Sequence, residues 1–346
     1  MATTLRFATL ADVAREAGVS TATADRVLHN RQGVRLRTRE RVMNAARQLG
    51  YVSTDNGSPL REAPAGQLQL DFVLPGGPNT FMNNLASLIE DAGARHVSAD
   101  VRVHRIDGFD PEALAGKLEE LASTSKGVAL IGLDHPAVRE AVRALSVADV
   151  PVVTLVSDIS HVPRVGYVGI DNRAAGRLAG YLLGRLHGKQ PAKVALFAGS
   201  LAYRGHEERE MGFRHILAEE FPQLEIVDRA ESRDDFERTY RDATELLRRI
   251  PDLAGIYNIG AGNRGIARAL EEAGRAREVI FIGHEVTEFT RRFLLSGTMD
   301  AAIDQNPRVE AREAILRLVA AADGENGFTN YMVRMQAVFR ENIPDF

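Results

Sequence analysis

The sequence predicts an α + α/β fold class, with an N-terminal three-helix, helix-turn-helix head followed by a two-lobed, Rossmann-like body. Three observations predict it. Apolar residues recur at helical spacing between positions 10 and 49. After position 66, strand-like apolar runs alternate with helical stretches, which is typical of parallel sheets covered by helices. The stretch between these parts is rich in turn formers and lacks apolar periodicity.

The first predicted helix begins after Thr9, which with Asp12 gives a capping-box-like start. Its apolar stripe consists of Leu10, Val13, Ala14 and Ala17. Gly18 ends this helix, because glycine adopts the positive φ of a sharp turn without steric cost.

Ser20 caps a second predicted helix. Its inward side carries Ala24, Val27 and Leu28, and its outward side carries Thr21, Ala22, Asp25 and Arg26. A third helix, from about Thr38 to Leu49, repeats the apolar pattern and ends at Gly50. Two helices joined by a tight turn, with polar outward positions on the second, indicate a helix-turn-helix that reads a DNA major groove.

The charge distribution favours the same interpretation. Residues 1–50 contain nine arginines, no lysine and four acidic residues, a net charge of +5, whereas the other 296 residues carry −9. A basic head on an acidic body is typical of a protein that contacts phosphates at one end. The alternative is a solvated basic face formed by Arg31, Arg35, Arg37, Arg39 and Arg41.

Composition excludes several classes of function. The 346 residues, 45% of them hydrophobic, suffice for two or three packed units. The chain has no cysteine, which excludes disulfides, thiolate metal sites and cysteine nucleophiles. There is no apolar run of about 18 residues and no signal-peptide pattern, so we expect a soluble, cytoplasmic protein.

We expect a DNA-binding domain at residues 1–52, a linker at 53–66 and the body at 67–346. The expected strands of the body are 68–74, 101–106, 127–133, 152–155, 167–170, 194–198, 225–228, 255–259, 279–283 and 333–339. The expected helices are 80–95, 111–124, 136–147, 173–187, 206–220, 234–249 and 263–273. Ligands of open parallel sheets bind beyond the carboxyl ends of the strands, so polar residues there are the candidates for a binding site.

Several segments of the head resemble one known family. They are Thr9-Leu-Ala-Asp-Val-Ala-Arg-Glu-Ala-Gly-Val-Ser20, Arg26-Val-Leu-His-Asn30, Thr38-Arg-Glu-Arg-Val42 and Leu49-Gly-Tyr51. They are similar to the DNA-binding head of the lac repressor (LacI/GalR-type) family.

The body resembles the effector domain of that family, which is of periplasmic-binding-protein type I. The matching segments are Val168-Gly-Ile-Asp-Asn-Arg-Ala-Ala-Gly176, Arg209-Glu-Met-Gly-Phe213, Phe281-Ile-Gly-His-Glu285 and Ala302-Ile-Asp-Gln-Asn306. The resemblance implies one lobe of about 67–168 and 299–326, and a second of about 169–298 and 327–346.

The resemblance also implies DNA contacts at particular positions. Thr21, Ala22 and Arg26 fall where the family reads base edges, and arginine suits a bidentate contact to guanine. The family's phosphate contacts fall near Thr9, Ser20, Thr23, His29 and Thr38. Leu60 aligns with a leucine that the family inserts into the minor groove from a hinge helix. Gly57 and Pro59 disfavour a helix there, by about 1 and 3 kcal/mol relative to alanine.

For the effector, the resemblance implies that Arg209, Glu285 and Gln305 bind hydroxyl groups, because they offer donors and acceptors to a polyhydroxylated ligand. Phe81 and Tyr203 follow strands and can stack on its apolar face. Asp134, Asn258 and Asn263 are further candidates. An alternative for Arg209 is an ion pair with one of its neighbours in Glu207-Glu-Arg-Glu210.

One glycine-rich motif indicates a different function, the binding of a dinucleotide. Gly260-Ala-Gly-Asn-Arg-Gly265 is a GxGxxG between a strand and a helix, and Glu285 lies 20 residues beyond its last glycine. Taken alone it suggests NAD, but it stands late in the chain instead of in a first βαβ unit. The segments beginning at His206 and His284 lack the second histidine of HExxH, and Ser200 is not within GxSxG. We therefore expect no catalytic residues, metal or cofactor.

The sequence as a whole predicts a homodimeric regulator, acting as a repressor on double-stranded operator DNA in the cytoplasm, associated with the nucleoid. Two heads reading a pseudo-palindrome require a dimer. A small sugar, polyol or related effector bound between the lobes would control operator affinity. The alternative function is a nicotinamide-dependent or sugar-modifying enzyme that carries a DNA-binding head. The effector's identity, the operator and the sign of control stay open at this point.

Overall fold

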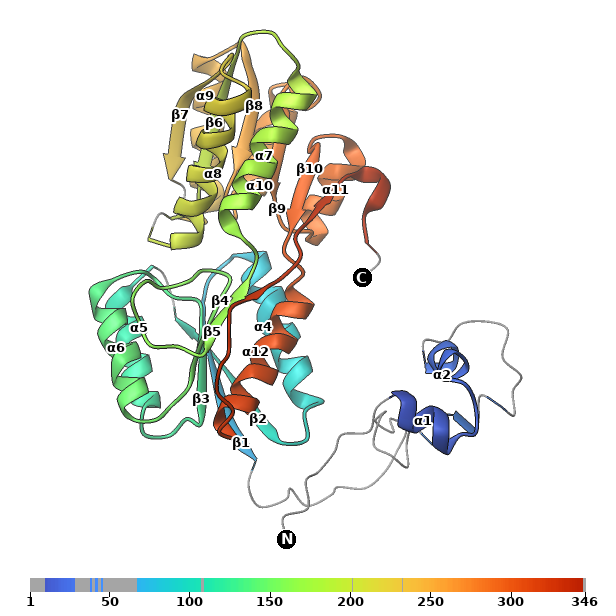
Figure 1. Cartoon of the computed structure of the whole chain (residues 1–346). Coiled ribbons are helices and arrows are strands. Elements are labelled where there is room, and N and C mark those ends of the chain that lie inside the picture. The colour runs from blue at the N-terminus through green and yellow to red at the C-terminus, as the bar shows by residue number, and fades with distance from the viewer. Residues whose placement is uncertain are drawn as a thin grey trace. The chain divides into compact units, whose positions relative to one another are not determined.

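A computed structural model describes residues 10–28, 38, 41–42, 45, 67–106, 109–200, 202–231 and 233–344. The chain forms two compact units, Met1–Ala63 and Pro64–Phe346, called the head and the body below (Figure 1). The expected linker at 53–66, together with Thr9, His29 and Leu60, lies outside the described residues.

The head contains α1 (Leu10–Glu16) and α2 (Thr21–Leu28), joined by a turn at Gly18 with φ of +60°. Its core consists of Val13, Ala14, Ala17, Ala24, Val27, Val42 and Ala45. The Thr23 N–H donates to Ser20 Oγ at 3.2 Å, which confirms the predicted cap. Arg41 donates to the carbonyl of Ala17 at 2.6 Å and so ties the turn to the helical residues that follow.

The body contains two six-stranded sheets. In the first, the order is β11-β5-β4-β3-β1-β2, and all neighbouring strands are parallel. In the second, the order is β12-β10-β9-β8-β6-β7, parallel except that β12 runs antiparallel to β10. The first sheet consists of β1 (Leu68–Pro75), β2 (Ala99–Ile106), β3 (Gly127–Leu130), β4 (Val152–Leu155), β5 (Gly166–Gly169) and β11 (Tyr331–Met332). The second consists of β6 (Ala192–Ala198), β7 (Leu224–Glu231), β8 (Leu253–Asn258), β9 (Ile280–His284), β10 (Ala301–Asp304) and β12 (Gln336–Val338).

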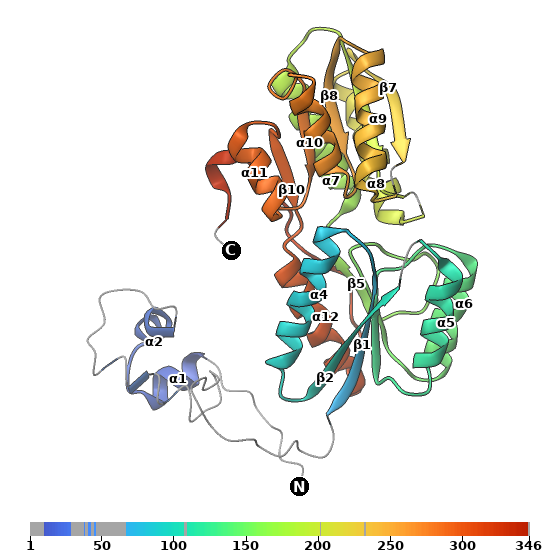
Figure 2. The ribbon, with the colours of Figure 1, turned by 180° about the vertical axis from the view of Figure 1, so that it is seen from behind.

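Helices cover both faces of each sheet, and this explains the continuous apolar runs of the central strands. The first sheet has α5 (Pro111–Leu121) and α6 (Pro136–Val147) on one face, and α4 (Thr80–Ala94) and α12 (Pro307–Ala322) on the other (Figures 1 and 2). The second sheet lies between the pair α7 (Asn172–His187) and α8 (Arg204–Glu220) and the pair α9 (Phe236–Arg249) and α10 (Asn263–Glu272) (Figures 1 and 2). The short α11 (Glu288–Ser296) contacts β10 and the terminal turn Arg340–Asn342.

The chain passes three times between the lobes: from β5 to α7, from β10 to α12, and from β11 to β12 (Figure 1). The expected lobe boundaries are wrong at the second and third connections. Residues 301–304 belong to the second sheet, because Ala301 pairs with Ile282 of β9. Residues 331–332 belong to the first sheet, because Tyr331 pairs with Val168 of β5. Of the strand expected at 333–339, only Gln336–Val338 forms as β12, and the residues just before the expected range, Tyr331–Met332, form β11 in the other sheet.

The α7–α8 pair packs unusually closely, and glycines make this possible. A Cβ added to Gly176 on α7 would lie 1.9 Å from the backbone carbonyl oxygen of Arg209 on α8. A Cβ added to Gly212 would lie 2.0 Å from the carbonyl oxygen of Arg173 in the same way. The contact fixes the position of Arg209 relative to the first connection between the lobes.

Candidate functional site

A cavity of about 110 Å³ lies between the two lobes of the body. On this measure one ordered water needs roughly 10–15 Å³, so the cavity has space for about seven to eleven waters, or one monosaccharide. Its wall brings together six of the predicted effector residues: Phe81, Tyr203, Arg209, Asn263, Glu285 and Gln305. They come from the start of α4, the start of α8, the start of α10, the end of β9 and the second connection.

Arg209 is 4% exposed and donates three hydrogen bonds from its guanidinium. Nε donates to Asn172 Oδ1 at 2.7 Å, Nη1 to the Ile259 carbonyl at 3.1 Å, and Nη2 to Gln305 Oε1 at 3.5 Å. Its acceptors therefore lie on α7, after β8 and on the second connection. The expected alternative, an ion pair with a sequence neighbour, is wrong, because the guanidinium donates to these three neutral acceptors, while Glu208 pairs with Arg204 and Glu210 with Arg214 and Arg229.

Glu285 occupies a strained position at the end of β9. Its φ is +70°, in the left-handed region that non-glycine residues rarely adopt, and such strain concentrates at functional sites. Oε1 accepts a hydrogen bond from Gln305 Nε2, whereas Oε2 is buried without a partner among the described residues. Burial, and secondly the charge of Asp304, raise the pKa of Glu285 to about 8. Burial therefore favours the protonated form of this carboxyl, and one of its oxygens is available to a ligand.

Two of the predicted candidates do not line the cavity. Asp134 forms an ion pair with Arg139 at 2.8 Å. Burial opposes ionisation of Asp134, but hydrogen bonds from Arg139 and Ser160 outweigh it and lower its pKa. Asn258 is buried next to a residue that does line the cavity, and its amide donates to Asn263 Oδ1 at 2.7 Å. Asn263 in turn donates to the His284 carbonyl at 2.9 Å, so Asn258 acts by positioning a lining residue.

Sequence reasoning missed several lining residues, among them Asn79, Ser157, His206, Asp234, Phe236, Arg264 and Phe289. Asn79 Nδ2 donates to Asp234 Oδ2 at 2.8 Å and so links the two lobes across the cavity. Asn79 is also the N-cap of α4, and it follows the first strand. The strand-end rule applied above would have found it. Nothing in the sequence pairs it with Asp234, which is 155 residues away.

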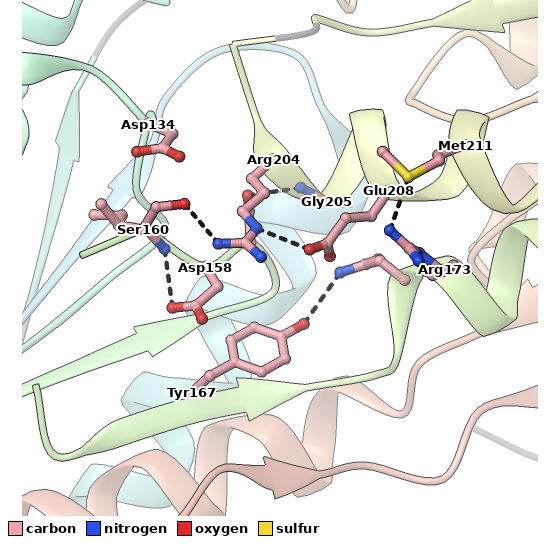
Figure 3. Close-up of polar contacts among 12 residues, drawn as sticks. Asp134, Asp158, Ser160, Tyr167, Arg173, Arg204, Gly205, Glu208 and Met211 are labelled. Atoms are coloured by element: carbon pink, nitrogen blue, oxygen red, sulfur yellow. Dashed lines mark hydrogen bonds and ion pairs between the residues drawn. The ribbon is translucent and has the colours of Figure 1, made fainter. Parts of the chain in front are cut away.

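Further hydrogen bonds join the lobes beside the cavity. Figure 3 shows Arg204 pointing toward Ser160, whose Oγ accepts from Arg204 Nη1 at 2.6 Å, while Nε pairs with Glu208 at 2.8 Å. The Gly205 N–H donates to Ser157 Oγ at 3.1 Å, and the Asp134 N–H donates to the Ala202 carbonyl at 3.1 Å. The two lobes are therefore held together by polar contacts on more than one side of the cavity.

The GxGxxG motif is explained by packing of the chain on itself. A Cβ on Gly260 would lie 2.5 Å from the Gly199 backbone nitrogen, and one on Gly265 would lie 2.7 Å from the Tyr240 backbone nitrogen. The glycines thus let the β8–α10 turn approach its neighbours closely. Within the described ranges, no group of three or more His, Asp or Glu side chains could hold a metal ion. No helix in those ranges is long and apolar enough to cross a membrane.

The pKa of Glu285 predicts a pH dependence of stability. A carboxyl whose pKa rises from 4.5 to about 8 on folding favours the folded state fully below pH 4.5, and this contribution is lost as the pH rises to about 8. The slope from one such group is at most about 1.4 kcal/mol per pH unit. Urea unfolding between pH 5 and 9 should therefore show a smaller decline for Glu285→Gln than for the wild type. Identical declines would contradict this assignment.

In the head, the structure leaves the predicted base-reading residues accessible. Thr21, Ala22 and Arg26 are exposed on α2, while Ala24 and Val27 of the same helix are 0% and 4% exposed. Ser20 and Thr23 lie at the start of this helix, and Thr38 is half-buried. An exposed face on a second helix anchored by a small core is the arrangement that enters a major groove.

A helix-turn-helix with an exposed second helix, followed in the chain by two parallel-sheet lobes that enclose a polar-lined cavity, is the architecture of a DNA-binding protein whose body has a cavity of small-molecule size. Residues 9–53 match the bacterial regulatory proteins of the lacI family, and residues 70–326 match the periplasmic binding protein domain. The chain therefore belongs to the periplasmic binding protein domain family through its body and carries a lacI-family helix-turn-helix domain as its head.

Individual relatives agree with this assignment. The chain is 33% identical over 213 residues to an HTH-type transcriptional regulator in the aml 5′ region of Streptomyces limosus, a match that covers 61% of this chain and 58% of that one. It is 26% identical over 274 residues to the HTH-type transcriptional regulator DegA of Bacillus subtilis, covering 78% and 77% of the two chains. A solute-binding protein from Burkholderia graminis in complex with D-arabinose has the same body fold, with a TM-score of 0.76, 20% identity and coverage of 83% and 99%.

Proposed function

We propose that this regulator is a homodimeric repressor whose operator affinity is set by a small sugar, polyol or related molecule bound between its lobes. The observation that carries the proposal is the unpartnered, buried Oε2 of Glu285 in a cavity that also holds Arg209 and Gln305. A polyhydroxylated ligand would satisfy that oxygen. Aromatic rings of Phe81 and Tyr203 in the same wall suit the apolar face of a sugar ring. The arabinose bound by a protein of the same fold supports this ligand class.

The effector would act through the equilibrium between open and closed lobes. Both lobes contribute to the cavity wall, so a ligand that contacts both favours closure. In a dimer held by the body, closure would move one lobe relative to its partner and change the spacing of the two heads. A coupling free energy of about 1–3 kcal/mol would change operator affinity roughly 5- to 150-fold. Such a regulator works on the nucleoid, in the cytoplasm.

Ligand screening by thermal shift tests the effector half of the proposal. A panel of aldoses, polyols and sugar phosphates, with NAD as a separate probe, should contain a compound that stabilises the protein. At 100 times its dissociation constant such a compound adds about 2.7 kcal/mol to the free energy of unfolding. The same compound should change operator binding in a gel shift. Stabilisation by NAD and by no sugar would instead favour the enzyme hypothesis.

On the DNA side, we propose that Thr21, Ala22 and Arg26 read bases and that Ser20, Thr23 and Thr38 contact phosphates. Replacing Arg26 by alanine should cost about 1–3 kcal/mol on the preferred sequence and relax selectivity at one base position. Selection from random duplex, followed by binding to single-base variants of the selected site, measures this. Arg214→Ala, an exposed arginine of the body, is the control. An unchanged preference at every base would rule out base reading by Arg26.

A further inference from the structure

Arg264 is a cation held in place at the cavity by two aromatic rings. It stands in the first turn of α10, and its Cζ lies 4.9 Å from the ring centroid of Phe236 and 4.2 Å from that of Phe289. All three side chains line the cavity. A cation over the face of a ring is attracted by the ring's quadrupole, and this contact does not require the five N–H donors of the guanidinium. The rings therefore orient Arg264 and leave its hydrogen-bonding edge available.

Arg268, one turn further along α10, differs from Arg264 because its guanidinium is paired with carboxylates. It also contacts a ring, that of Tyr240 at 4.1 Å. However, its Nε pairs with Glu272 at 2.9 Å and its Nη1 lies 3.9 Å from Glu237. It does not line the cavity. Among the residues the structure describes, the Arg264 guanidinium contacts the two rings and forms no hydrogen bond or ion pair. The donors of Arg264 are thus unused by the protein, while those of its neighbour are paired.

The other charged groups of the cavity do not balance Arg264. Asp234 forms no ion pair with Arg264. Its two oxygens accept hydrogen bonds from other groups, Asn79 Nδ2 at 2.8 Å and the Ala261 N–H at 3.3 Å. Arg209 adds a second positive charge, and its donors go to neutral acceptors. Burial lowers the pKa of His206 to about 3, so this ring is neutral, and it raises that of Glu285 to about 8. At neutral pH the wall therefore carries an excess of positive charge.

Local electrostatics make Arg264 unfavourable for its own helix. α10 begins after Gly262 without a side-chain cap and has no acidic residue in its first turn. The amide end of a helix carries partial positive charge, so a cation there is repelled and an anion is attracted. An anionic group beside Arg264 would relieve this repulsion and would accept hydrogen bonds from the guanidinium edge, as carboxylates and phosphates do.

The same cavity contains a second unsatisfied group of a different kind. Glu285 is 8% exposed, and its Oε2 is buried without a partner in the described structure. A hydroxyl of a ligand would satisfy it. We propose that the effector is an anionic carbohydrate, a monosaccharide-sized polyol that carries a carboxylate or phosphate, with its hydroxyls at Glu285 and its charged group at Arg264. This inference rests on the proposed function and narrows its ligand class.

The test compares neutral sugars with their charged derivatives on the full chain. The common aldopentoses and aldohexoses are each tested beside the corresponding aldonate and terminal phosphate, by thermal shift and then by calorimetry. The proteins are the wild type, Arg264→Gln, Arg264→Lys and the matched control Arg268→Gln. We expect a charged member to bind the wild type and Arg268→Gln equally, and to bind Arg264→Gln at least 10-fold more weakly. Arg264→Lys, which keeps the charge, should recover part of the affinity.

The outcomes separate the two proposals. Binding of an aldonate identifies a carboxylate as the charged group, and binding of a sugar phosphate identifies a phosphate. If a neutral sugar binds as tightly as its charged derivatives, and equally to the wild type and Arg264→Gln, the anionic ligand class is overturned while the proposed function stands. If no sugar of the panel binds, neutral or charged, both proposals fall. Affinity for a charged sugar that is insensitive to salt between 50 and 300 mM would also contradict a contact with exposed Arg264.

Discussion

Replacing Arg209 by alanine should reduce affinity for the effector by about 2–5 kcal/mol, roughly 30- to 5,000-fold. The guanidinium is buried and holds Asn172, the Ile259 carbonyl and Gln305. Its removal leaves these acceptors unpaired and frees Gln305, which itself donates to Glu285. Calorimetric titration with the sugar identified by screening measures the loss.

Two further variants make the result on Arg209 interpretable. Arg209→Lys keeps a positive charge but cannot reach three separate acceptors with a planar fork, so we expect it to lose most of the affinity while folding. Arg214→Ala removes an exposed ion pair with Glu210 on the same helix, and such pairs contribute about 0–1 kcal/mol. Effector affinity of Arg209→Lys within twofold of the wild type would show that Arg209 does not position the ligand.

Gly176→Ala should destabilise the body by about 2–4 kcal/mol. The new methyl group would lie 1.9 Å from the Arg209 carbonyl oxygen, which is backbone and cannot rotate away. The pair α7–α8 must therefore separate, which loosens the second lobe and displaces Arg209. Urea unfolding measures the change in free energy.

Gly116→Ala is the matched control for Gly176→Ala. Gly116 is also a helical glycine, in α5, but a Cβ there meets nothing within 4 Å. Alanine is the better helix former by roughly 0.5–1 kcal/mol, so this variant should gain stability. Equal effects of the two substitutions would contradict the close contact between α7 and α8.

Much of the fold could be predicted from the sequence, because its signals are local. The apolar stripes of the head, the Gly18 turn and the Ser20 cap all act within a few residues. The nine expected strands from 68 to 283 correspond to β1–β9, since buried parallel strands are continuous apolar runs. β10 was not predicted as a strand, because Ala301–Asp304 is short and its apolar residues are mostly alanine. α12 was not predicted, although Ala311, Ala314, Ile315 and Leu318 form an apolar stripe at helical spacing within it.

The candidate site was predictable only where a single residue carried the signal. Positions after strands, together with the family resemblance, led to Arg209, Glu285 and Gln305. Pairs such as Asn79 and Asp234 depend on how the two lobes meet, and no local pattern encodes that. Arg264 stood inside the GxGxxG motif, where the glycines suggested a cofactor. The structure shows that the glycines serve packing and that the arginine between them faces the cavity.

The hydrogen bonds from Arg204 to Ser160 and from Gly205 to Ser157 involve no ligand. These hydrogen bonds stabilise the closed arrangement of the lobes whether or not an effector is bound. Part of the population would therefore already be in the state that the effector selects. Apparent affinity scales with the fraction of molecules that is competent to bind. Natural variation at Ser160, which does not line the cavity, would shift the midpoint of an induction curve and its background level in the absence of inducer, while leaving ligand preference untouched. Sensitivity and selectivity of the response are thus set by different residues and can evolve separately.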